Sequence, residues 1–249
     1  MIFSAGVRLQ SYASIAAFAA LRVSRFSEPF LRLQLHRQLR LWGISAVPLT
    51  GALAILIGAF AMAQVTALVG PNNETAERLF FNFWVFEVAP VLCALVLVAR
   101  SSAAIAAELV MMHGRGEYTS LRRMNIAAAD FLLLPRLWSM AIGLTTITLL
   151  FQGLLLVSGA LSIAFLQQLS PLETFGRLLD VANVWSVPVC ILKCLVMGLL
   201  VCAIACHHGT DIQVSAHAVS DASVYAVGGG ILSIFIVEMV FVMGAHWLL

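Results

Sequence analysis

Charged residues are scarce in this chain, and that scarcity excludes most classes of protein. Of its 249 residues only 10% are Asp, Glu, Lys or Arg, whereas 61% are hydrophobic. A soluble domain carries roughly 25% charged and 45–50% apolar residues. No water-soluble core of this size could bury the apolar excess. The composition therefore excludes a soluble enzyme, a nucleic-acid-binding protein and a disordered regulator, and it predicts an integral membrane protein.

Catalytic and nucleotide-binding signatures are missing as well. The chain has no G-x-x-x-x-G-K-[ST] loop, and its single lysine, Lys193, lies inside an apolar segment. We find no paired nucleophile and base, so we expect no catalytic residue and no cofactor in this chain. If ATP powers transport here, ATP and Mg²⁺ must bind to a separate ATPase chain.

Long apolar segments predict five membrane-spanning helices. A bilayer core about 30 Å thick needs about 20 apolar residues per helix, and the sequence shows none of the alternating strands that build a barrel. We therefore predict an all-α integral membrane protein. The predicted spans are residues 45–69, 79–112, 137–165, 184–208 and 224–249.

Basic residues outside the spans predict the orientation of the chain. Ten arginines lie before the first span or between the second and third spans, whereas the other two loops hold only Arg78 and Arg177. Loops rich in Lys and Arg stay in the cytoplasm, so we expect a cytoplasmic N-terminus and, after five spans, an external C-terminus. The ten arginines are Arg8, Arg22, Arg25, Arg32, Arg37, Arg40, Arg115, Arg122, Arg123 and Arg136.

Residues 1–44 are predicted to form a separate unit on the cytoplasmic side. Several polar residues fall within roughly a 100° arc of a helical wheel, and apolar residues cover most of the rest. The polar residues are Ser4, Arg8, Ser11, Arg22 and Arg25. This pattern is typical of an amphipathic helix that lies in the membrane interface. A signal peptide or an organellar transit peptide is the alternative interpretation.

Five charged residues lie inside the predicted spans, where a charge costs at least about 2.5–3.5 kcal/mol and usually faces a partner or a wet cavity. Glu87 and Arg100 are 13 residues apart, about 20 Å along a helix, so they cannot pair with each other. Glu87, Lys193 and Glu238 are either a polar lining for a charged or amphiphilic substrate or structural ion pairs. Arg100 and Glu108 lie near the cytoplasmic end of span two, where a structural role is favoured.

Four cysteines share the fourth predicted span. Cys190 and Cys194 form one i, i+4 pair, and Cys202 and Cys206 form another. Twelve residues separate Cys194 from Cys206, about 18 Å along a helix, which is too far for one zinc site. Because buried cysteine is a common small apolar residue, we predict no metal site.

The second predicted span carries a motif in two segments. Glu87-Val-Ala-Pro-Val-Leu-Cys-Ala-Leu95 is followed by Ala99-Arg-Ser-Ser-Ala-Ala-Ile-Ala-Ala-Glu-Leu109. These segments resemble E-L-G-P-V-L-x-A-L and G-R-x-G-A-A-I-A-A-E-L of the MlaE/YrbE family of lipid ABC-transporter permeases. The similarity continues through Leu134-Pro-Arg136 and Leu192-Lys-Cys-Leu-Val-Met-Gly198. Glu238 stands where the family has Asp in its last span.

The resemblance implies that residues 45–249 form the permease domain of a lipid ABC transporter. Members of this family work as dimers of five-span subunits, bind P-loop ATPase subunits, and usually meet a periplasmic ring of MCE-domain proteins. They move phospholipid or related lipids between the bacterial inner membrane and that ring. By this resemblance Glu87, Lys193 and Glu238 lie near the lipid cavity.

Residues 114–127 correspond to the family's coupling segment, which docks on the ATPase. The coupling residues implied by the resemblance are Glu117, Leu121, Arg122, Arg123 and Met124. The family's E-Q-I-D-A-L becomes Gly116-Glu-Tyr-Thr-Ser-Leu121 here, so both acidic positions are lost. These departures fit a divergent member, such as one half of a heterodimeric permease.

Two other functions remain open from the sequence. A secondary transporter or channel would use Glu87, Lys193 and Glu238 as an ion or proton relay, and its transport would follow the proton gradient and ignore ATP. A non-transporting scaffold would only anchor a periplasmic ring, and the lost coupling acids favour it. Nucleotide-stimulated lipid transfer would separate the permease from the scaffold.

Overall fold

The computed structural model describes residue 12 and residues 14–17, 29–42, 46–70, 74–124, 129–167, 170–180, 186–210 and 217–248. Within these ranges the chain consists of helices and short turns, without a strand. Five helical segments are long and apolar enough to cross a membrane. They are Val47–Val69, Thr75–Gly114, Phe131–Phe165, Ser186–Thr210 and Ala218–Gly244. The predicted all-α membrane fold with five spans is therefore confirmed.

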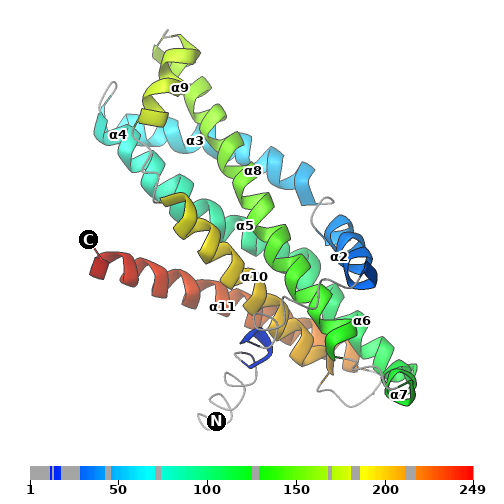
Figure 1. Ribbon diagram of the computed structural model, residues 1–249. Helices are drawn as coiled ribbons and strands as arrows, with labels where there is room; N and C mark the ends of the chain where they lie inside the picture. Colours follow the sequence, from blue (N-terminus) through cyan, green and yellow to red (C-terminus); the bar gives the residue numbers. More distant parts are fainter. Residues whose placement is uncertain are drawn as a thin grey trace.

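Four of the five spans are built around one long α-helix each. These are α3 (Val47–Val69), α8 (Leu134–Gln167), α10 (Ser186–Thr210) and α11 (Ala218–Leu248). Short helices lie beside them: α2 (Pro29–Trp42), α7 (Glu117–Arg123), η5 (Ala129–Leu133) and α9 (Pro171–Asp180). Helix α8, green in Figure 1, contacts α2, α3, α9 and α10, whereas the C-terminal end of α11 lies apart from α8 and α9.

The predicted N-terminal unit is described only in part. Within residues 1–44, α2 is a 14-residue helix that packs against α8. The arginines and serines that suggested an amphipathic helix before residue 26 lie outside the described residues. Placement of this unit in the membrane interface stays a prediction.

Span two is not a single α-helix. It consists of α4 (Glu74–Leu79), the π-helical segment η3 (Phe80–Val88), α5 (Ala89–Leu97), the π-helical segment η4 (Val98–Ser102) and α6 (Ala103–Gly114). A π-helix bonds residue i to residue i−5, and its short segments frequently occur at functional sites. Glu87 lies in η3 and Arg100 lies in η4. Both charges in the interior of span two therefore occupy its two irregular segments.

Small residues allow the spans to approach each other closely. A Cβ atom on Gly58 of α3 would lie 2.6 Å from the carbonyl oxygen of Leu155 on α8. A Cβ atom on Gly198 of α10 would lie 2.6 Å from the Cα of Ala141, also on α8. Close packing of this kind is typical of membrane helices, where small residues let backbones come together.

We expect Gly198→Ala to destabilise the protein by about 1–3 kcal/mol, the range for overpacked sites. The added methyl group meets the backbone of Ala141, so α8 and α10 must separate. Gly153→Ala on α8 is the matched control, since its Cβ meets no atom within 4 Å and alanine is the better helix former. Thermal unfolding in detergent checks both. Equal midpoints for the two variants would contradict the tight α8–α10 contact.

Candidate functional site

Three charged side chains from three spans meet at one buried point. The Nζ atom of Lys193 on α10 lies 2.6 Å from Oε2 of Glu87 on η3 and 2.8 Å from Oε1 of Glu238 on α11. The lysine side chain is only 3% exposed. The structure thus brings together the three residues that the sequence analysis singled out, and we call them the ion triad. Their role in handling a substrate stays a prediction.

A proline explains the third partner of Lys193. Pro90 has no N–H, so it cannot bond the carbonyl of Phe86 four residues earlier, as an α-helix requires. The Nζ atom of Lys193 donates a hydrogen bond of 3.2 Å to that Phe86 oxygen. The ammonium group of Lys193 therefore has three acceptors for its three N–H donors.

The charges of the ion triad do not balance. One ammonium group faces two carboxyl groups, and Oε2 of Glu238 is buried without a hydrogen-bond partner among the described residues. The whole side chain of Glu238 is 16% exposed and that of Glu87 is 38% exposed, so both are less buried than the side chain of Lys193. Chemically, the triad can hold one additional proton or a cationic group beside its second carboxylate.

A second ion pair lies toward the end of the bundle where α6 meets α7. Nη2 of Arg136 on α8 lies 2.9 Å from Oε2 of Glu108 on α6 and donates to Sδ of Met112 at 3.7 Å. The sequence analysis placed Arg136 in the loop between spans two and three, and that placement is wrong. The span begins earlier, and Arg136 is 2% exposed inside it.

The remaining predicted structural charge is Arg100, which is exposed on η4. Glu108, the other charge for which a structural role is predicted, forms the ion pair with Arg136. The observed spans contain both Arg136 and Arg78, so the count of loop arginines becomes nine against one. The cytoplasmic N-terminus and external C-terminus stay predictions.

The predicted coupling segment contains a short helix. Gly116 has a φ of +72°, a conformation that glycine adopts most easily, and it forms the turn between α6 and α7. This backbone conformation explains why a glycine stands at position 116, where the family has an acidic residue. Met124 is exposed, Leu121 is half-buried, and Arg123 is exposed. Oε1 of Glu117 lies 3.9 Å from Nη1 of Arg115.

Tyr118 attaches α7 to the bundle. Its ring contacts His113 with 5.4 Å between the centroids, and it packs against the apolar core. Burial raises the pKa of the Tyr118 phenol, so the phenol stays neutral at physiological pH.

Arg122 lies in the same helix, and residues 125–127 of the predicted segment lie outside the described residues. Docking of α7 on an ATPase stays a prediction.

The cysteines of α10 are buried thiols. Cys202 and Cys206 bring their sulfur atoms to 3.9 Å, one helical turn apart. All five cysteines of the chain are free and buried. Over the described ranges the structure groups no three His, Cys, Asp or Glu side chains in an arrangement that could hold a metal ion.

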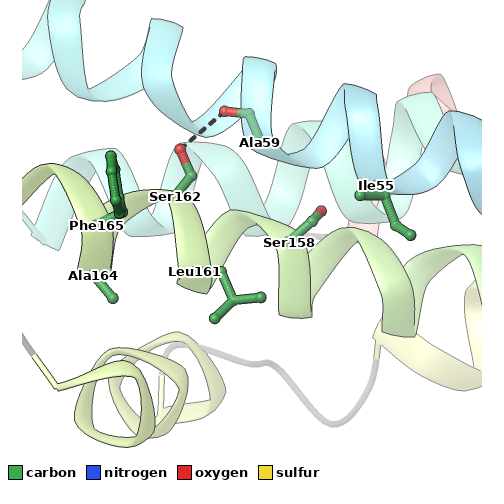
Figure 2. A pocket seen from close by; sticks show the side chains of 7 residues that line it. All are labelled: Ile55, Ala59, Ser158, Leu161, Ser162, Ala164 and Phe165. Carbon is green, nitrogen blue, oxygen red and sulfur yellow. Dashed lines mark hydrogen bonds between the residues drawn. The ribbon is translucent and has the colours of Figure 1, made fainter.

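An open groove with a volume of about 610 Å³ lies between α3 and α8 (Figure 2). It is lined by Ile55, Ala59, Ser158, Leu161, Ser162, Ala164 and Phe165. The hydroxyl groups of Ser158 and Ser162 donate to carbonyl oxygens of α3 at 3.4 and 3.2 Å, so the groove presents an apolar surface. None of the three residues of the ion triad lines it.

Comparison with known proteins places the chain in a family. A model of the family "Permease MlaE" matches residues 35–243. The probable ABC transporter permease protein slr1045 of Synechocystis is 28% identical over 150 residues, which cover 60% of this chain and 57% of that protein. The Arabidopsis thaliana protein TRIGALACTOSYLDIACYLGLYCEROL 1, chloroplastic, is 25% identical over 154 residues, or 62% of this chain and 44% of that protein.

The matched part of the chain therefore spans about half the length of these curated relatives. The family match covers most of the chain, and the five apolar helices agree with a protein that crosses the membrane several times. The chain belongs to the MlaE permease family, and its five long apolar helices are those of a multi-pass membrane protein.

Proposed function

We propose that this chain is the transmembrane subunit of an ABC-type lipid transporter in the bacterial inner membrane. A separate P-loop ATPase chain binds ATP and Mg²⁺ and docks on α7. A second permease copy or a homologue completes the dimer. Phospholipid or a related lipid moves between the membrane and a periplasmic MCE-domain partner.

The observation that carries this proposal is the ion triad inside a chain of the MlaE family. Lys193, Glu87 and Glu238 come from three helical segments long and apolar enough to span a membrane, and they are in contact; charges inside a membrane are expensive and usually functional. The name of the Arabidopsis relative is that of a glycolipid, which supports a lipid as the substrate. In the mechanism we propose, ATP binding moves α7, and the ion triad positions the polar headgroup or gates its passage.

We expect Glu238→Ala to reduce ATP-dependent lipid transfer about tenfold, which corresponds to roughly 1.4 kcal/mol in the barrier. The substitution leaves Lys193 with Glu87 and the Phe86 carbonyl, so the fold and the complex should survive. The measurement is transfer of a labelled phospholipid between vesicles holding the purified complex and its MCE partner. Glu173→Ala, at an exposed acid of α9, is the matched control. Normal transfer by Glu238→Ala would remove this residue from the mechanism.

The ion triad also bears on the proton-coupled alternative, because its second carboxylate can hold a proton. The same vesicles separate the two functions. Transfer that requires ATP and persists after an ionophore collapses the proton gradient supports the ABC permease. Transport that follows the gradient and ignores ATP would replace the proposal with a secondary transporter.

A further inference from the structure

Gln152 links three spans at the level of the ion triad. It lies in the middle of α8 and is only 6% exposed. Its Nε2 atom lies 2.7 Å from the carbonyl oxygen of Val85 on η3 and 3.2 Å from Sγ of Cys190 on α10. Sequence analysis gave no reason to select this residue, since a single amide in an apolar helix has no motif around it.

The acceptor at Val85 exists because of the helix irregularity around Pro90. The N–H of Ala89 bonds the oxygen of Trp84, five residues earlier, at the end of η3. The next residue, Pro90, has no N–H. Continuing the same pattern would require Pro90 to bond Val85, and a return to α-helical bonding would require it to bond Phe86.

Side chains from two other spans replace the missing donor. Gln152 donates to Val85, and Lys193 donates to Phe86. A buried carbonyl in a membrane has no water to bond, so both acceptors need such partners. Glu87 follows these two carbonyls directly in the chain, and its carboxylate meets Lys193 at 2.6 Å. The bond from Gln152 therefore fixes the segment that presents Glu87.

We infer that Gln152 is a positioning residue for the ion triad: it holds η3 in the register that brings the Glu87 carboxylate to Lys193. This inference rests on the proposed function for its effect on lipid transfer. Its structural part depends only on the contacts of Val85, Pro90 and Gln152.

The test is a double-mutant cycle between Gln152→Leu and Pro90→Ala. Leucine removes the donor, so Val85 loses its partner. The Pro90→Ala substitution restores a backbone N–H that can bond Val85 in its place. Thr148→Val is the matched control, because Thr148 is buried one turn away on α8, whereas the side chains that donate to the Val85 and Phe86 carbonyls are those of Gln152 and Lys193. The purified permease is followed by thermal unfolding, and its complex is followed by ATP-dependent lipid transfer.

We expect Gln152→Leu to lower the unfolding midpoint by at least about 3 °C. The same substitution should reduce the rate of lipid transfer several-fold. Thr148→Val should be close to wild type in both measurements. In the Pro90→Ala background the midpoint loss from Gln152→Leu should fall to less than half. A residue that only fills space would lose the same amount in both backgrounds, and that result would overturn the inference. If Gln152→Leu yields no folded protein, Gln152→Met, which keeps an unbranched chain and lacks the donor, is used in both backgrounds.

The lipid-transfer assay gives a second test of whether Gln152 positions Glu87. Gln152→Leu should add little to the loss caused by Glu87→Gln, because both changes act through the same carboxylate. Multiplicative losses would contradict action through Glu87. A wild-type complex that moves no lipid would contradict the proposed function, whereas the thermal cycle would still decide whether Gln152 supplies the donor that Pro90 lacks.

Discussion

Lys193→Met is expected to destabilise the protein by about 3–5 kcal/mol, the range measured when one partner of a buried ion pair is removed. Methionine keeps the length of the side chain and removes its charge. Glu87 and Glu238 would then face each other without a cation, and the Phe86 carbonyl would lose its donor. Of the single substitutions considered, this one leaves the most uncompensated charge, because two carboxyl groups lose their shared cation.

Thermal unfolding and expression yield measure the loss of stability in Lys193→Met. A triple variant without any of the three charges is the control. Glu87→Gln/Lys193→Met/Glu238→Gln removes all three charges together. Replacing a buried ionic group by neutral residues of similar size is often neutral or stabilising, so the triple variant should recover most of the lost stability. It should still fail to move lipid, because the charges themselves are gone. A Lys193→Met protein as stable as wild type would mean that the triad is not held together as described.

Glu108→Met should destabilise the protein more than Arg136→Met, although the two substitutions break the same ion pair. Removing Glu108 leaves a guanidinium group that is 2% exposed, whereas removing Arg136 leaves a carboxylate that is 40% exposed and can reach water. We expect about 3–5 kcal/mol for Glu108→Met and about 1 kcal/mol or less for Arg136→Met, the range of exposed pairs. The buried arginine has two further nitrogens, Nε and Nη1, that bond no described residue.

Unfolding midpoints of the two single variants and the double variant check this asymmetry. The double variant removes both charges and should be more stable than Glu108→Met alone. Equal losses for the two single variants would show that solvent does not reach Glu108 in the assembled protein. A small loss for Glu108→Met would show that another group compensates Arg136.

Much of the fold could be predicted because hydropathy alone selects segments that cross a bilayer. The five apolar segments lie where expected, and their helices start or end up to six residues from the predicted bounds. One of the largest shifts, at the start of the third span, changes the interpretation of Arg136. Hydropathy ends a span at the nearest arginine, but a carboxylate on another helix can neutralise that arginine inside the bundle.

The site could be predicted only as a set of isolated charges. Helical geometry excluded a pair between Glu87 and Arg100, so Glu87 required a partner on another span, and Lys193 is that partner. Glu87 and Lys193 are 106 residues apart, and Lys193 and Glu238 are 45 apart. No local spacing encodes such contacts. The π-helical segments were not predicted either. At η3 the carbonyls that Pro90 leaves free are bonded by side chains from other spans, and no local pattern encodes those bonds.

The two π-helical segments also make span two mechanically uneven. Helices bend sharply at π-bulges, at prolines and at few other places. Span two is therefore divided into α-helical pieces, α4, α5 and α6, by two segments where a helix can bend, η3 and η4. The middle piece, α5, has 9 residues, about 14 Å at 1.5 Å per residue. In the chain, η4 separates α5 from α6, which leads to α7, and η3 precedes α5. The bend segment on the α7 side of α5 is thus η4, and the one that carries the Lys193 contacts is η3, so substitutions can address the two separately.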